Sequence, residues 1–307
     1  MTSVRRHRAA GCLLASLLTA AGAVSARTFP LPSQLDGVIG SIGTVTARHE
    51  DTLSDIARAH EVGFAAIVAA NPGVDPWLPG AGTRIVLPTR HVLPDAPREG
   101  LVLNLPEFRL YHYHASRAGS AGSVSTYPVS IGDVDWRTPL GLTRVVSKVE
   151  KPSWRPPASI RAEHARDGDP LPAVVPPGPD NPLGDFALRL AVPGYLIHGT
   201  NKPYGIGMRV THGCVRLYPE HIARLYRESP VGTPVRIVDQ PVKAGWDDGV
   251  LFLEVHPPLA ESRTDAGVTA AVRAVIAATK DRSALIDWDA VERAARERRG
   301  VPVPVSR

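Results

Sequence analysis

Two short segments of the sequence carry the residue types of a cysteine nucleophile and its base. One has His198 directly after an apolar stretch, and the other has His212 and Cys214 in a loop before Pro219. The thiolate is the nucleophilic form of cysteine, but a free thiol has a pKa of about 8.5 and is mostly protonated at neutral pH. A nearby imidazole can take that proton and hold the thiolate in an ion pair. The pattern therefore predicts Cys214 as a nucleophile, with a histidine as its base.

Gly213 lies beside the thiol and suggests how the loop could bind a reacting carbonyl. Without a side chain there, the substrate can approach the backbone, and the amides of Gly213 and Cys214 can donate to an oxyanion. Each such donor contributes about 3 kcal/mol in other acyl-transfer enzymes. Taken alone, a histidine at a strand end is often only a hydrogen-bonded surface residue, and Gly-Cys in a turn is a weak sign.

Two histidines and one cysteine are also a partial zinc site. Zinc ligands usually lie at tighter spacings and with a further ligand, however. The sequence contains no Gly-rich phosphate loop and no Cys/His cluster with metal spacing. We therefore expect neither a cofactor nor a metal.

Residues 1–26 have the pattern of a Sec signal peptide. A basic start, an apolar run and a small-residue cleavage pattern follow one another: Arg5, Arg6 and Arg8, then Ala9–Val24, then Val24-Ser25-Ala26. A transmembrane anchor is the alternative, but the run is short for a bilayer and contains Gly, Ser and Thr. Cleavage removes Cys12 and leaves Cys214 alone in an oxidising compartment, without a disulfide partner. That isolation is a second indication of a chemical role.

The net charge gives little support for a polyanionic partner. The formal charge is +5, and removing the three arginines of residues 1–26 leaves +2. We see no basic stripe with interleaved aromatic residues and expect no nucleic-acid partner. The 307 residues suffice for about two domains. Thirty prolines and 27 glycines favour short strands and turns over long helices.

After a lead-in over residues 27–43, residues 44–88 are predicted to form a strand–helix–helix–strand unit. Asp51 and Thr52 offer an N-cap, and apolar residues follow at helical spacing. The second helix ends at Asn71-Pro72-Gly73, a strong breaker.

This unit resembles a LysM domain. The matching segments are Asp51-Thr52-Leu53, Ile56-Ala57, Ala70-Asn71-Pro72 and Ile85-Val86-Leu87-Pro88. The resemblance implies binding to the N-acetylglucosamine-containing glycan of peptidoglycan. The alternative is a helical-hairpin spacer without a ligand.

Residues 99–239 are predicted to form a larger, mainly β domain. Short strand candidates joined by turn residues indicate an antiparallel sheet or sandwich; they are 101–105, 108–113, 126–131, 142–149, 187–191, 195–198 and 235–238. Residues 150–184 interrupt this pattern with many prolines, and we interpret them as a lid or cleft wall. Residues 240–307 are predicted to be an extension that continues through one strand into two Ala-rich helical segments, 267–279 and 290–298.

The histidine and cysteine segments together resemble the signature of the L,D-transpeptidase (YkuD-like) catalytic domain. The matching residues are Ile197-His198-Gly199-Thr200 and Thr211-His212-Gly213-Cys214-Val215-Arg216-Leu217. The flanks are similar to the subgroup that follows a LysM domain in Gram-negative periplasms, as at Pro182-Leu183-Gly184 and Gly205–Val210. The resemblance implies a mainly β fold: a YkuD-like β-sandwich, a small LysM (βααβ) domain before it and a partly helical C-terminal extension.

The same resemblance implies roles for individual residues. Cys214 would be the nucleophile and His198 its general base and acid, while His212 and Gly213 would belong to the loop that shapes the oxyanion site. Arg216 is expected to grip a stem-peptide carboxylate bidentately; the alternative is a solvated residue at a helix start. The residues after the histidine are expected to contact substrate: Gly199, Thr200 and Asn201.

The implied reaction is acyl transfer on peptidoglycan stem peptides through a Cys214 thioester. The diaminopimelate–D-Ala bond of a tetrapeptide stem is broken, and an acceptor amine takes the acyl group. That amine belongs to another stem, giving a 3→3 cross-link, or to the lysine of an outer-membrane lipoprotein. Such enzymes are periplasmic, remodel the cell wall and are carbapenem targets. Two alternatives are an L,D-carboxypeptidase acting on the same bond and a catalytically degenerate peptidoglycan-binding protein.

Overall fold

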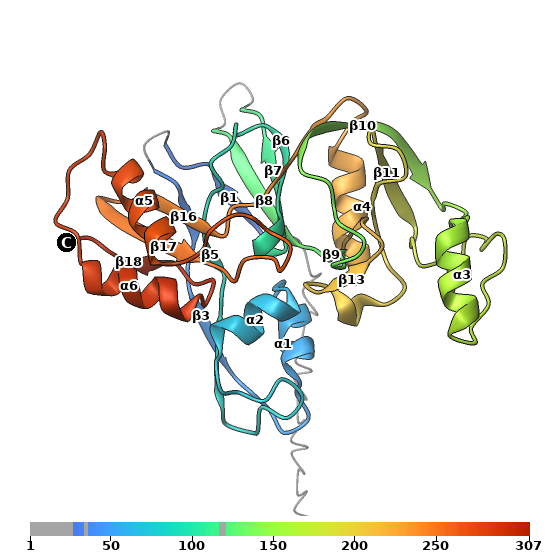
Figure 1. Ribbon diagram of the computed structural model, residues 1–307, viewed down its shortest axis with the longest axis horizontal. Helices are drawn as coiled ribbons and strands as arrows, with labels where there is room; N and C mark the ends of the chain where they lie inside the picture. The colour runs from blue at the N-terminus through green and yellow to red at the C-terminus, as the bar shows by residue number, and fades with distance from the viewer. Residues whose placement is uncertain (1–26, 34–35, 117–120) are drawn as a thin grey trace, which may run out of the picture.

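The computed structural model of the chain describes residues 27–33, 36–116 and 121–307. The signal peptide expected over residues 1–26 lies outside them. In Figure 1 a central β region carries a small unit below it, the C-terminal helices on one side and helix α3 (Ala158–Arg166) on the other. No helix in the described part of the chain is long and apolar enough to cross a membrane. The chain is mainly β, as predicted.

Nine strands of the described residues form one sheet. Along the chain they are β1 (Thr28–Pro30), β6 (Gly100–Asn104), β7 (Arg109–His114), β8 (Ser123–Pro128), β10 (Gly141–Glu150), β11 (Phe186–Leu190), β12 (Leu196–His198), β14 (Val215–Arg216) and β15 (Pro234–Val238). Their order in the sheet is β1-β8-β7-β6-β15-β10-β11-β12-β14. Most neighbours are antiparallel, as predicted, but β6–β15 and β12–β14 are parallel. Parallel pairs need long connections, so a succession of short apolar runs does not reveal them.

Strand β10 bends this sheet. Its first residues, Gly141–Arg144, pair with β15, and its later residues, Val145–Glu150, pair with β11. A register shift between Val145 and Ser147 accompanies the exchange of partners, and such bulges bend and twist a strand. Figure 1 shows β10 running over the top of the central region. The two parts of the sheet therefore share one core, which includes Leu101, Leu103, Leu110, Val145, Leu188, Ile197 and Val235.

Helix α4 (Pro219–Glu228) packs into the same core. Pro219 begins the helix, where its fixed φ is compatible with helix and no backbone N–H is needed. Ile222 and Leu225 are buried among the core residues. Because α4 follows β14 closely, burial of this helix face also fixes the end of the strand that begins after Cys214.

The small unit consists of β3 (Gly43–Thr46), α1 (Leu53–Ala59), α2 (Phe64–Ala70) and β4 (Arg84–Leu87). This is the predicted order of elements, with β3 and β4 antiparallel. Thr52 and Asp55 form a capping box at the start of α1. Asn71, which ends α2, is buried and exchanges two hydrogen bonds with the backbone of Val86 at 2.7 and 2.9 Å. One asparagine thus stops the helix and ties it to the closing strand.

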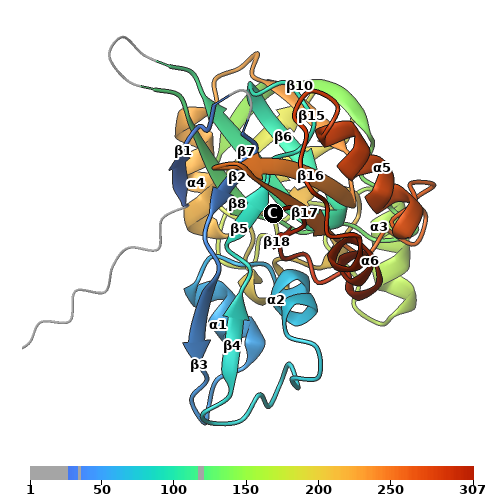
Figure 2. The same cartoon turned by 90° about the vertical axis from the view of Figure 1, so that its left-hand side faces the viewer.

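Antiparallel strands β2 (Val38–Gly40) and β5 (Arg90–Val92) flank this unit in the chain. In Figure 2, β3 and β4 of the unit extend away from the central region, below β2 and β5. The chain therefore enters and leaves the small unit through one pair of strands, β2 and β5.

The C-terminal extension differs from its prediction. It contains a hairpin, β16 (Val242–Asp247) and β17 (Val250–Val255), and a short strand β18 (Val303–Pro304), not a single strand. Lys243 and Gly245 interrupt the apolar pattern of β16, which explains the omission. The helices α5 (Val268–Ala278) and α6 (Trp288–Glu297) confirm the two helical segments. The buried Lys243 ammonium lies 2.8 Å from Glu107 and 3.2 Å from Glu254, and so joins the extension to the central region.

Candidate active site

The two predicted segments meet at the parallel pair β12–β14. His198, at the end of β12, pairs with Arg216 of β14, and Cys214 immediately precedes that strand. The imidazole, the thiol and the guanidinium are therefore neighbours at the edge of the sheet. In the described part of the chain, no hydrogen bond joins the thiol to an imidazole; Cys214 Sγ lies 3.7 Å from the carbonyl oxygen of Gly194, to which it can donate.

The orientation of His198 is set by backbone carbonyls. Its Nδ1 lies 2.7 Å from the carbonyl oxygen of Gly199, and since a carbonyl can only accept, Nδ1 carries the proton. Nε2 of the neutral ring therefore has the free lone pair that a base needs. Burial, with a smaller contribution from the Arg216 charge, lowers the pKa of His198 to about 3, although the carbonyls of Gly199 and Leu183 oppose this. The ring is neutral at physiological pH.

The thiol is also neutral in the resting site. Burial raises the pKa of Cys214, while the Leu196 N–H and the Arg216 charge act in the opposite direction. A raised thiol pKa and a lowered imidazole pKa both disfavour charge. These two shifts disfavour, in the free enzyme, the ion pair expected from the sequence, because burial penalises the charged form of each group. Proton transfer then accompanies attack on the substrate.

Alkylation of Cys214 by iodoacetamide is expected to report this neutral resting pair. Because the thiol pKa is raised, the rate should climb about tenfold per pH unit from pH 6 and continue to rise beyond pH 9. No step is expected near pH 6.5, since His198 titrates at about 3. Samples of wild type and Cys214→Ala are quenched at successive times and analysed by mass spectrometry. The difference between them gives the rate of alkylation at Cys214. A rate that stays constant from pH 5 to 8 would indicate a resting ion pair instead.

The nucleophile loop is held so that an amide faces outward. Gly213 has φ of +95°, and a Cβ there would lie 2.7 Å from the Tyr195 ring. Thr138 Oγ1 donates to the Gly213 carbonyl at 2.9 Å and accepts from the Gly132 N–H at 3.0 Å. In a trans peptide the carbonyl and the next N–H point in opposite directions. Thr138 therefore turns the Cys214 N–H away from itself, and this N–H donates to no backbone carbonyl in the described residues.

Two short parallel strands, β9 (Ile131–Gly132) and β13 (Arg209–Thr211), support this loop. Thr211 follows the same principle as Thr138, because its Oγ1 donates to the Cys214 carbonyl at 2.6 Å. The carbonyls of Gly213 and Cys214 therefore each accept a hydrogen bond from a threonine hydroxyl.

His212 does not join the thiol. Its Nε2 lies 3.0 Å from Glu163 of helix α3, and its ring makes an edge contact with Trp136 at a centroid distance of 5.0 Å. The histidine thus connects the nucleophile loop to the 150–184 segment. Within that segment the buried Asn181 amide donates to the carbonyls of Pro152 and Pro176 at 2.7 and 3.1 Å, which ties its two ends together.

Arg216 is a half-buried cation with no carboxylate within 4.0 Å among the described residues. Its Nε is buried and has no hydrogen-bond partner in the part of the chain that the structure describes. Burial lowers the pKa of Arg216, and Cys214 acts in the opposite direction. An unpaired guanidinium beside a thiol and an imidazole can bind an anionic ligand.

The residues that follow His198 mainly shape the loop. A Cβ on Gly199 would lie 3.0 Å from Ile222, so this position packs against α4. Thr200 is buried, and its Oγ1 accepts from the Lys202 N–H at 2.9 Å. Asn201 Nδ2 donates to the Pro179 carbonyl at 3.1 Å.

The spacer, residues 201–210 between the His198 and Cys214 segments, is hydrogen-bonded to the small unit. Helix α2 has no side-chain cap, because Gly63 stands at its N-cap. The carbonyls of Ile206 and Gly207 accept from its first N–H groups, those of Phe64 and Ala65, at 3.0 and 3.1 Å. These contacts satisfy donors that every helix start leaves open.

The comparisons agree on one family. A family model described as the L,D-transpeptidase catalytic domain (YkuD) matches residues 98–237. The chain is 40% identical over 290 residues to the probable L,D-transpeptidase YcfS of Escherichia coli K12, covering 92% of this chain and 89% of that protein. The chain belongs to the L,D-transpeptidase family. It is also 40% identical to the probable L,D-transpeptidase YbiS of the same strain, over 91% of this chain and 92% of that protein.

A solved L,D-transpeptidase from Mycobacterium smegmatis covers 51% of this chain and 63% of its own at 19% identity, with a TM-score of 0.35.

Two contributions to the site of the present chain were not predicted from its sequence. The carbonyl that orients His198 is a backbone group and leaves no residue-type signal. Thr138 lies far from both motif segments in sequence, and only the fold brings its hydroxyl to the Gly213 carbonyl.

Proposed function

We propose that this chain is a periplasmic peptidoglycan L,D-transpeptidase that works through a Cys214 thioester. The observation that carries the proposal is the orientation of His198: its Nδ1 is committed to the Gly199 carbonyl, so its Nε2 is available as a base next to the strand that directly follows Cys214. Family membership supports the reaction class. Export rests on the signal-like pattern of residues 1–26.

In the first half-reaction, Cys214 Sγ attacks the carbonyl at the L-centre of diaminopimelate in a tetrapeptide stem. His198 Nε2 takes the thiol proton, so the attacking species is formed only as the bond forms. The Cys214 and Gly213 N–H groups donate to the oxyanion. The tetrahedral intermediate collapses to the thioester, and the imidazolium returns the proton to the D-Ala amine as it leaves.

In the second half-reaction an acceptor amine attacks the thioester. His198 removes a proton from that amine, and Cys214 leaves as the thiol. The acceptor is an amine of another stem, which gives a 3→3 cross-link, or the lysine of an outer-membrane lipoprotein. Arg216 binds a carboxylate of the donor stem in both steps. This role is supported by the lack of a carboxylate within 4.0 Å of Arg216 in residues 27–33, 36–116 and 121–307.

The unit over residues 44–88 is proposed to be a LysM domain that binds the glycan strand. Its strand–helix–helix–strand order supports this. Its helix α2 hydrogen-bonds to the spacer that links the two catalytic segments. A glycan held by this unit would therefore keep its stem peptides near the Cys214 loop.

Thr138→Val is expected to lower kcat by about 10-fold to 100-fold with little change in KM. Valine has a similar shape but cannot hold the Gly213 carbonyl, so the Cys214 N–H loses its alignment; losing an oxyanion donor outright costs about 100-fold to 1,000-fold. Thr138→Ser keeps the hydroxyl and is the matched control. Steady-state kinetics with a tetrapeptide donor measure both. Equal loss in the two variants would show that packing, not the hydroxyl, matters.

The test of the function is incubation with purified tetrapeptide muropeptides, with and without a lipoprotein-derived lysine peptide, followed by mass spectrometry. We expect D-Ala release and a new amide to one of the acceptors, both absent in Cys214→Ala. Tripeptide alone, despite abundant acceptor, would favour the L,D-carboxypeptidase. Unchanged substrate with folded, reduced enzyme that still binds sacculi would favour the degenerate binding protein.

A further inference from the structure

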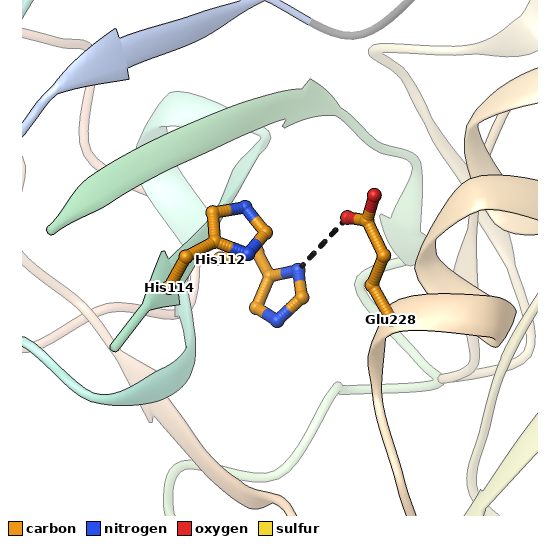
Figure 3. Close-up of side chains that lie close together, drawn as sticks. All are labelled: His112, His114 and Glu228. Carbon is orange, nitrogen blue, oxygen red and sulfur yellow. Dashed lines mark ion pairs between the residues drawn. The ribbon is translucent and has the colours of Figure 1, made fainter. Parts of the chain in front are cut away.

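A second group of chemically active side chains lies away from the active site. His112 and His114 are on one face of β7, and Glu228 is the last residue of α4. One potential ligand atom from each lies within 4.8 Å of the other two. Figure 3 shows both imidazole rings and the carboxylate turned toward one another.

The contacts among these three groups leave room for an ion. His112 Nδ1 is 3.8 Å from Glu228 Oε2, too far for a hydrogen bond, and it is buried with no hydrogen-bond partner among the described residues. The two rings have a centroid separation of 4.2 Å. Ligand atoms of tetrahedral zinc lie about 3.3 Å apart, since each is about 2.0–2.2 Å from the metal. Small side-chain movements would therefore complete a coordination set.

The surroundings of the cluster resemble those that orient metal ligands. Arg224 Nε donates to Glu228 Oε1 at 2.9 Å, which leaves Oε2 directed at His112. His114 Nε2 is hydrogen-bonded to Ser125 Oγ at 2.8 Å. Such outer contacts fix the orientation of ligating side chains. A cavity of about 680 Å³ adjoins all three residues and gives water access to a fourth position.

We propose that His112, His114 and Glu228 bind a divalent transition-metal ion, with zinc preferred and water as the fourth ligand. Imidazole and carboxylate suit zinc, and a buried nitrogen without a partner would gain one. The nearby Arg224 charge opposes the ion, which limits the affinity.

The ion would act as a clamp within the fold. It joins β7 to the C-terminal end of α4, the helix that follows the Cys214 strand. A second cluster, His91, Glu107 and Glu254, is not proposed as a metal site, because the Lys243 ammonium already lies between its carboxylates. From the sequence we expected no metal, because it has no Cys/His cluster with metal spacing. The two histidines of β7 are only two ligands, and Glu228 is remote from them in the chain.

The experiment is calorimetric titration of the full chain with ZnCl₂, together with the visible spectrum of the Co²⁺ form. His114→Gln and Glu228→Gln remove one ligand each at partly exposed positions. His49→Gln, at an exposed histidine elsewhere, is the control for unspecific binding. Cys214→Ala excludes the active-site thiol as a ligand, and thermal unfolding shows that each variant is folded.

We expect one zinc per chain in wild type, His49→Gln and Cys214→Ala, and an affinity at least about 100-fold lower in each ligand variant. Zinc at 100 times the wild-type Kd should raise the Tm of wild type by about 5 °C. The same concentration should not raise the Tm of either ligand variant. No binding, binding that survives both ligand variants, or a cobalt–thiolate absorption band would overturn the proposal. Transpeptidation is not the readout, so this result is independent of the proposed function.

Discussion

Cys214→Ala is expected to abolish acyl transfer, and His198→Asn to reduce it by about 100-fold to 10,000-fold. Alanine removes the sulfur that becomes the thioester, so no covalent route remains. Asparagine places an amide donor near the position of Nδ1 and can keep the bond to Gly199, but it has no counterpart of Nε2. The loss therefore isolates general base and acid catalysis, which contributes about that factor, or about 3–5 kcal/mol of barrier.

Steady-state rates of D-Ala release by both variants measure this effect. His49→Asn, at an exposed position far from the motif segments, is the matched control. Circular dichroism and thermal unfolding establish that the His198 variant keeps its fold. A rate for His198→Asn within threefold of wild type would mean that another group takes the thiol proton.

Arg216→Met is expected to lower kcat/KM by about 100-fold to 10,000-fold while leaving Tm unchanged or raised. Two charge-assisted hydrogen bonds to a substrate carboxylate are lost, and bonds of this kind contribute about 1.5–3 kcal/mol each. In the free enzyme, however, the guanidinium has no carboxylate partner within the described part of the chain, and its Nε is buried. An unpaired buried charge is costly, so an apolar side chain of similar length relieves that cost.

The combination of lost activity and retained stability distinguishes a substrate clamp from a structural residue. Arg189→Met, at an exposed position on β11, is the control and is expected to change neither quantity. Kinetics with the tetrapeptide donor and calorimetric unfolding are the measurements. A large fall in Tm for Arg216→Met would instead assign Arg216 a structural role.

The residue pattern anticipated the elements better than their connections. Helical spacing and turn residues located α1 and α2, and Ala-rich sequence located α5 and α6, because these signals are local. The parallel pairs β6–β15 and β12–β14 depend on segments distant in the chain. Strand β16 was missed because Lys243 disrupts its apolar pattern. Folding brings Glu107 and Glu254 to the Lys243 ammonium and so neutralises its charge.

For the site, residue types indicated the nucleophile and its base, but not their electrostatic state. The sequence argument assumed that a thiol and an imidazole in contact form an ion pair. Burial of His198 and Cys214 reverses that expectation, and burial is a property of the whole fold. The same holds for His212, whose partner Glu163 comes from a segment without clear periodicity.

The central claim is that Cys214 carries the acyl group, and intact-protein mass spectrometry tests it most directly. Wild type is mixed with a tetrapeptide donor whose own amines are acetylated, so that no amine acceptor is present, then quenched in acid and analysed beside Cys214→Ala. The account predicts an adduct with the mass of the tripeptide acyl group, located on Cys214 by peptide mapping and absent from the variant. Release of D-Ala with no covalent intermediate, or an adduct that persists in Cys214→Ala, would contradict it.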